Sequence, residues 1–145
     1  MTNLAELYDS FLSKITDYRL YKMTEEEIKE DLFRYYKSAR AKFHKCKKDL
    51  TVIDEVIQSD LSNFEVEIIV SLMLVEHIKP HLLSSENLKQ SLSDKDFKIY
   101  SQANQLRETR LLFDNLERKV NKMITEYTFL DLNEEKMTWL TTIQN

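Results

Sequence analysis

The alternation of apolar and polar positions predicts two amphipathic helices in the first third of the chain. Residues 4–18 place apolar side chains three and four positions apart, which is the spacing of one helical face. Residues 24–43 repeat this pattern, and Thr24 and Glu27 have the spacing of a capping box, in which each side chain accepts a hydrogen bond from a backbone N–H at the helix start. Residues 20–23 are predicted to connect the two helices. The apolar stripe of the second helix consists of Ile28, Leu32, Tyr35, Tyr36, Ala39 and Phe43.

Residues 61–83 predict a third helix that is buried on every side, with the other helices packed around it. It opens with a second capping box, formed by Ser62 and Glu65. The run from 68 to 75 is apolar except for Ser71, and a helix that is apolar all round must be buried all round. This run is far shorter than the roughly 20 apolar residues that span a membrane. Pro80 has no N–H to donate and is predicted to end the helix, after which residues 84–93 form a polar crossover.

Residues 47–61 carry a mixed pattern. The β-branched residues 51–53 favour a strand, whereas residues 54–57 could complete a short helix. We interpret this segment as a loop with a helical turn.

The last third of the chain predicts one long helix, from about Asp94 to Phe129, because its apolar residues keep helical spacing without Gly or Pro. More than 30 residues at a rise of 1.5 Å extend over roughly 45–50 Å. The core of a domain of this size does not require that length. Part of the helix is therefore expected to project or to pack against another subunit.

Residues 131–145 form a mostly polar tail with one apolar cluster. The tail either folds back onto its own helices or is an arm that becomes ordered against a partner. We favour the arm, because tryptophan is enriched at the centres of interfaces, where it buries a large rigid surface. The predicted partner-docking residues are Met137, Trp139, Leu140 and Ile143.

Composition supports a helical fold and a single domain. The 145 residues include one Pro and no Gly, although average proteins contain about 7% Gly. Glycine adopts positive φ at low cost, and tight hairpins and phosphate-binding loops depend on it. The expected fold class is all-α: a helical bundle with a buried central helix, a long C-terminal helix and a C-terminal tail. We expect one domain over residues 1–145, with a helical core at 1–130 and the tail or arm at 131–145.

Charge and cysteine content restrict the classes of function. The formal net charge of −4 argues against a dedicated nucleic-acid binder, which is usually basic. The single cysteine, Cys46, excludes an intramolecular disulfide framework and fits a reducing compartment. The first residues carry charges and aromatic rings where a signal peptide has a basic start and an apolar run. We therefore expect the protein to be made in the cytoplasm.

Two pairs of residues resemble metal or catalytic sites. His77 and His81 are four residues apart, a spacing that can direct two imidazoles toward zinc. Pro80 lies between them, so we favour histidines that cap the carbonyl groups of a helix end. His44 and Cys46 are two residues apart and point to different sides of a helix. We interpret Cys46 as a small buried apolar residue.

The run from Lys37 to Lys48 contains six Lys or Arg residues and no acid. It could contact phosphate groups, but positive charge at a helix C-terminus also stabilises the helix itself. The chain has no nucleophile elbow, phosphate-binding loop or paired-carboxylate motif. We predict no catalytic, cofactor or metal site, and an enzyme is the least favoured class.

Three stretches resemble a known family. They are residues 62–69 (SNFEVEII), 73–80 (MLVEHIKP) and 96–104 (DFKIYSQAN). They are similar to head–tail connector proteins, also called neck adaptor or head-completion proteins, of tailed bacteriophages that infect Gram-positive bacteria. The likeness covers about residues 28–128 and consists of packing signatures. The first helix, residues 4–18, is not part of it.

The resemblance implies an α-helical virion protein that assembles as a ring, typically of twelve copies, under the portal protein. Such adaptors extend the DNA channel, so that DNA is only passing cargo, and they dock the next neck, stopper or tail protein. Family members often grip the portal with a C-terminal arm, which here corresponds to residues 134–145. The implied location is the neck of the virion, after synthesis in the host cytoplasm, with no membrane partner. The alternative is a small helical DNA-packaging or regulatory DNA-binding protein, similar to a small terminase subunit.

Overall fold

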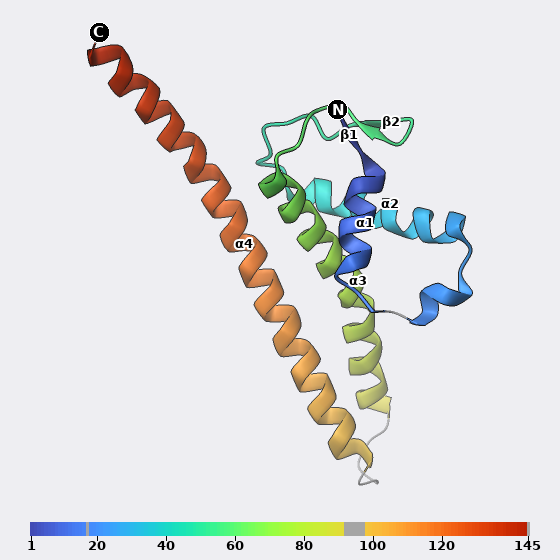
Figure 1. Cartoon of the computed structure of the whole chain (residues 1–145). Coiled ribbons are helices and arrows are strands. Elements are labelled where there is room, and N and C mark those ends of the chain that lie inside the picture. Colours follow the sequence, from blue (N-terminus) through green and yellow to red (C-terminus); the bar gives the residue numbers. More distant parts are fainter. Residues whose placement is uncertain (17, 92–97, 145) are drawn as a thin grey trace.

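The computed structural model describes the backbone of residues 1–16, 18–91 and 98–144, and the side chains of 1–16, 20–83 and 106–130. The protein is mostly helical with a small sheet, which confirms the helical class in its coarse form (Figure 1). The elements in chain order are β1 (Thr2–Asn3), α1 (Leu4–Ser13), the 3-10 helix η1 (Tyr18–Lys22), α2 (Glu25–Lys42), β2 (Val52–Ile53), β3 (Val56–Ile57), α3 (Asn63–Ser91) and α4 (Lys98–Gln144).

The capping boxes predicted for α2 and α3 are both present. At α2 the Thr24 N–H donates to the Glu27 carboxylate at 3.0 Å, and the Glu27 N–H donates to the Thr24 hydroxyl at 3.3 Å. At α3 the Ser62 N–H donates to the Glu65 carboxylate at 2.9 Å, and the Glu65 N–H donates to the Ser62 hydroxyl at 3.2 Å. These hydrogen bonds satisfy backbone donors that have no partner inside the helix, and so they determine where each helix begins.

The first helix is shorter than predicted. α1 ends at Ser13, because the Lys14 N–H turns back to the Phe11 carbonyl at 3.0 Å. The 3-10 helix η1 then provides the connector that the sequence predicted around residues 20–23. Apolar spacing therefore located the buried face of α1 but overestimated its length.

The core lies around α3, which packs against α1, α2 and α4. The predicted all-round burial is confirmed over the apolar run of α3, since Ile68, Ile69, Val70 and Met73 have no exposed surface and Leu72 is 4% exposed. Further along the helix Lys79, Pro80 and Leu83 are exposed. The apolar faces of the neighbouring helices complete the core. They contribute Leu4, Leu7 and Phe11 from α1, Leu32, Tyr36 and Ala39 from α2, and Val120 from α4.

The prediction that Pro80 ends the third helix is wrong. α3 continues through Pro80 to Ser91, so residues 84–91 are helical rather than a polar crossover. Proline removes one backbone hydrogen bond and crowds the preceding turn, which weakens a helix without always ending it. Packing of α3 against α1, α2 and α4 can compensate for that loss. The predicted start of the long helix at Asp94 lies outside the described residues, and the structure begins α4 at Lys98.

The interpretation of residues 47–61 as a loop with a helical turn is also wrong. β2 and β3 form an antiparallel hairpin, with Val52 opposite Ile57, and β1 pairs with the other edge of β3. The two turn residues, Asp54 and Glu55, both have positive φ, at 51° and 62°. This is the left-handed turn that tight hairpins favour and that usually contains Gly. Hence the expectation that a chain without Gly avoids such turns is wrong as well.

α4 is longer than the predicted helix. It runs without interruption to Gln144, so the backbone of the predicted tail is helical over residues 131–144. Figure 1 shows α4 alongside α3, with its C-terminal part extending away from the other helices. In the described part of the chain, no helix is long and apolar enough to cross a membrane.

Candidate functional site

The two faces of α4 differ in what they contact. The inner face packs on the core through Phe113, Leu116, Val120, Met123, Ile124 and Tyr127. The outer face exposes two apolar pairs to solvent. Leu111 and Leu112 are 55% and 61% exposed, and Phe129 and Leu130 are 57% and 54% exposed. Single exposed apolar residues are common on proteins, but pairs repeated along one helix indicate a contact surface.

The two apolar pairs lie on the same side of α4. They are separated by 18 positions, which correspond to about five helical turns and roughly 27 Å along the axis. Between them the same side of the helix exposes three bases, Arg118, Lys119 and Lys122, and one acid, Glu126. We call these seven residues, the two apolar pairs and the three bases between them, the outer stripe.

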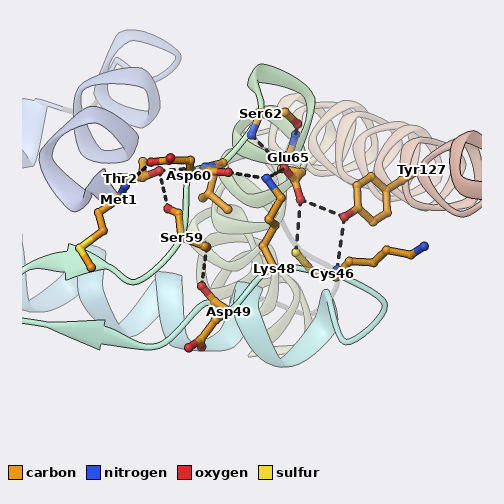
Figure 2. A network of polar contacts seen from close by, with 12 residues as sticks. Met1, Thr2, Cys46, Lys48, Asp49, Ser59, Asp60, Ser62, Glu65 and Tyr127 are labelled. Carbon is orange, nitrogen blue, oxygen red and sulfur yellow. Dashed lines mark hydrogen bonds and ion pairs between the residues drawn. The ribbon is translucent and has the colours of Figure 1, made fainter. Parts of the chain in front are cut away.

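A buried carboxylate fastens the inner face of α4 to the start of α3 (Figure 2). Glu65 is 2% exposed. Its Oε2 accepts a hydrogen bond from the Tyr127 hydroxyl at 2.9 Å and a weaker one from the Cys46 thiol at 3.7 Å. The Lys48 ammonium lies 3.5 Å from its Oε1. We call Cys46, Lys48, Ser62, Glu65 and Tyr127 the Glu65 cluster.

The Glu65 cluster keeps its carboxylate charged. Burial by itself raises the pKa of Glu65, but hydrogen bonds from Ser62 and Tyr127 and the charge of Lys48 outweigh burial, so the pKa lies below its ordinary value of 4.5. Burial raises the pKa of Tyr127, and its bond to Glu65 raises it further, so the phenol stays protonated and remains a donor. Burying an unpaired charge costs free energy, and the hydrogen bonds and the ammonium group around Glu65 offset that cost. The cluster therefore links the start of α3 to α4 and stabilises their packing.

Cys46 has a more polar environment than the sequence suggested. It is half-buried rather than fully buried, and its thiol faces the Glu65 carboxylate. Burial, followed by the negative charge of Glu65, raises the pKa of the thiol. A raised pKa lowers the fraction of reactive thiolate, so the arrangement does not suit a nucleophile. His44 is exposed, and no hydrogen bond or ring contact described in the structure joins it to Cys46.

The Glu65 cluster continues toward the N-terminus through backbone contacts (Figure 2). The Lys48 ammonium donates to the Asp60 carbonyl at 2.5 Å, and the Asp60 carboxylate pairs with the N-terminal amine of Met1. The Thr2 hydroxyl donates to the Ser59 carbonyl at 2.9 Å. These contacts hold the irregular segment before α3 in place, and that segment in turn positions Lys48.

His77 and His81 lie next to each other, as their spacing predicted, with ring centroids 5.5 Å apart. They do not cap a helix end, because α3 continues past them. The His77 ring instead packs edge-on against Phe11 and Tyr35, at 5.6 and 5.7 Å. Over the described residues, no group of three or more His, Cys, Asp or Glu side chains is arranged to hold a metal ion.

The two histidines border a pocket of about 430 Å³ that lies among α1, η1, α2 and α3. Most of its lining is apolar or aromatic, and Asp31 is the acidic residue in it. We call it the aromatic pocket. Its other lining residues are Phe11, Ile15, Leu20, Met23, Ile28, Leu32, Tyr35 and Pro80.

Much of the basic run contacts the protein itself. The Lys42 ammonium pairs with Glu76 at 2.6 Å, and the Lys37 ammonium lies 5.1 Å from the centre of the Phe33 ring. Arg40 reaches the Leu50 carbonyl at 3.5 Å. Lys48 belongs to the Glu65 cluster. These contacts favour the structural interpretation of the run over a phosphate-binding surface.

The predicted docking residues Met137, Trp139, Leu140 and Ile143 stand on the helical backbone of α4, and their side chains lie outside the described residues. Their docking role stays a prediction.

Sequence reasoning missed the outer stripe, although one signal was visible. Leu111–Leu112 and Phe129–Leu130 each place a second apolar residue beside the regular stripe, which widens the apolar surface beyond one face.

Comparisons with known proteins add no relative. No family model, no curated protein and no solved structure matches the chain. The resemblance to a known family therefore rests on the three sequence stretches alone and stays a prediction.

Proposed function

We propose that this chain is a structural protein of a tailed-phage virion, a head–tail connector that assembles as a ring under the portal protein. The observation that carries the proposal is the outer stripe. α4 contains 47 residues and uses one face for its own core, while the opposite face exposes four large apolar side chains. Such a surface is typical of a protein that binds another protein. The resemblance of residues 62–69, 73–80 and 96–104 supports a phage neck as the setting.

In this proposal each part of the chain has a structural role. The helical body forms the wall of the ring, typically of twelve copies, around a channel through which DNA passes as cargo. Residues 134–145 contact the portal, and the opposite end of the ring docks the next neck, stopper or tail protein. The proposal assigns no catalytic residue and no cofactor.

Native mass spectrometry at two protein concentrations tests the assembly. A connector should give one discrete ring mass, or a monomer that converts to that mass as the concentration rises. The same measurement with a short DNA duplex tests the alternative, a small terminase-like or regulatory DNA-binding protein. The exposed bases Arg118, Lys119 and Lys122 are the feature that favours the alternative. A dimer whose mass increases by one duplex would contradict the connector.

Deletion of residues 134–145 tests the docking segment. If these residues contact only a partner, the deletion should leave the melting temperature nearly unchanged and abolish binding to the portal protein. Trp139 is the single tryptophan, so its fluorescence reports on this segment alone. Emission should come from a solvent-exposed indole in the free monomer and shift to the blue on assembly. Blue-shifted emission in the monomer, with a large loss of stability after deletion, would show that the segment belongs to the core.

A further inference from the structure

The outer stripe has a specific chemical pattern that a partner must match. Phe129 and Leu130 form an apolar end, and Lys122 lies seven positions before Phe129, which is about two turns and roughly 10 Å along the helix. Phe129 lies two positions after Tyr127, which still packs against the core, and the C-terminal part of α4 extends away from the other helices (Figure 1). A second protein can therefore approach this end of the stripe without meeting α1 or α2 of the same chain.

The aromatic pocket carries the complementary pattern. Its volume of about 430 Å³ accommodates more than one large side chain. The His77 ring packs edge to face with both Phe11 and Tyr35, and the rings of Phe11 and Tyr35 are tilted against each other. Such a cluster accepts a further aromatic ring. Negative charge gathers at the same edge. Asp31 lines the pocket, where its carboxylate pairs with Arg34 of the same helix, and Ile28, another lining residue, directly follows the exposed acidic residues 25–27.

The two surfaces cannot meet within one chain. Figure 1 shows α4 along one side of α3, while α1, η1 and the start of α2 lie on the other side. The outer stripe faces away from α3, because the inner face of α4 is the one that packs on the core. A contact between stripe and pocket therefore joins two copies head to tail. Contacts of this type close into a ring when the rotation between copies allows it.

We propose that Phe129 and Leu130 of one copy insert into the aromatic pocket of a second copy, with Lys122 beside the acidic edge at Asp31. This inference rests on the proposed ring assembly and names the two surfaces that build it. Phe129 supplies the apolar anchor, and the opposite charges select the orientation of the two copies. Because those charges lie near the surface, salt should weaken the assembly.

The apolar half of the contact is tested by Phe129→Asp. The change should raise the apparent dissociation constant of the assembly by more than roughly tenfold, since it places a charge in an apolar pocket. Ile53→Asp is the matched control, because Ile53 is similarly exposed, at 56%, but lies in β2, away from both the stripe and the pocket. Sedimentation velocity over a concentration series measures both variants. A normal helical circular dichroism spectrum for each variant shows that it is folded.

The charged half is tested by exchanging charges. Lys122→Glu and Asp31→Lys should each weaken assembly, and the two together on one chain should restore it, because the exchanged charges again attract. Glu30→Lys is the control for Asp31→Lys. Glu30 directly precedes Asp31 in α2 and is exposed. Its side chain points about 100° away from that of Asp31 around the helix.

The outcomes distinguish a failure of this interface from a failure of the proposed connector function. If wild type forms a ring and Phe129→Asp does too, or if the combined variant fails to recover, this interface is wrong and the connector function stands. If Glu30→Lys weakens assembly as much as Asp31→Lys, general electrostatic attraction explains the effect and the pocket is excluded. If wild type stays monomeric at every concentration, both the interface and the ring are contradicted.

Discussion

The contact between Tyr127 and Glu65 should contribute measurably to stability. Tyr127→Phe keeps the aromatic ring, which packs against Phe43 at a centroid distance of 5.1 Å, and removes only the hydroxyl. The carboxylate of Glu65, which is 2% exposed, then loses a donor at 2.9 Å. Hydrogen bonds to charged groups contribute roughly 1.5–3 kcal/mol. The Lys47 N–H, which donates to the same hydroxyl at 3.3 Å, is near the surface and can bind water instead. We expect a loss of about 2 kcal/mol in the free energy of unfolding.

Urea denaturation followed by helical circular dichroism measures this loss. With a urea dependence of about 2 kcal/mol per molar, the midpoint should fall by roughly 1 M. The protein concentration must be low enough to keep the chain monomeric, because assembly would add to the apparent stability. Tyr21→Phe is the control, since Tyr21 is 87% exposed and surface changes stay within about 0.5 kcal/mol.

A double-mutant cycle with Glu65→Gln separates this contact from other effects. In the Gln background the phenol faces a neutral acceptor, so Tyr127→Phe should cost only about 1 kcal/mol. An equal cost in both backgrounds would show that the charge of Glu65 does not act on the phenol. An unchanged urea midpoint for Tyr127→Phe would refute the idea that the Glu65 cluster stabilises the packing of α3 against α4.

Three further measurements test the core, the hairpin and the buried charge. Leu72→Ala should destabilise the protein by about 2–5 kcal/mol, through lost burial and the cavity left behind, and a thermal melt identical to wild type would place the core elsewhere. Glu55→Gly should raise the urea midpoint by an amount equivalent to about 0.5–1 kcal/mol, because Gly adopts the observed φ of 62° without steric cost, and a lower midpoint would show that this turn carries no strain. The pKa of Glu65 is lower in the folded than in the unfolded state, so its contribution is complete above pH 4.5 and is lost as the pH falls through the folded pKa. Acid titration of the unfolding midpoint should show this loss, and Glu65→Gln should remove that part of the pH dependence.

Local sequence signals determined where the helices begin and which face is buried. Thr24 with Glu27, and Ser62 with Glu65, form their capping boxes within four residues, so no distant part of the chain is needed. The apolar spacing of α1 and α2, and the apolar run of α3, identified the core side of each helix, because burial of apolar surface dominates folding energetics. The predominance of helix also followed from composition.

Tertiary structure decided what depends on distant neighbours. The helix continues through Pro80, and the packing of α3 as a whole against α1, α2 and α4 can offset the one lost hydrogen bond. The hairpin at Asp54 and Glu55 forms beside β1, whose pairing with β3 joins residues 2–3 to residues 56–57, and the Leu4 N–H donates to the Glu55 carbonyl at 3.0 Å. No local pattern contains such a partner.

The candidate sites likewise depend partly on local sequence and partly on tertiary structure. The sequence by itself identified Glu65 as a capping residue, but its second role requires Tyr127, which is 62 positions away. It also indicated that α4 is too long for one small core, yet the outer stripe became visible only once the inner face was known. Which side of a helix is left for a partner depends on which side its own fold has already covered, and only the packed structure determines that.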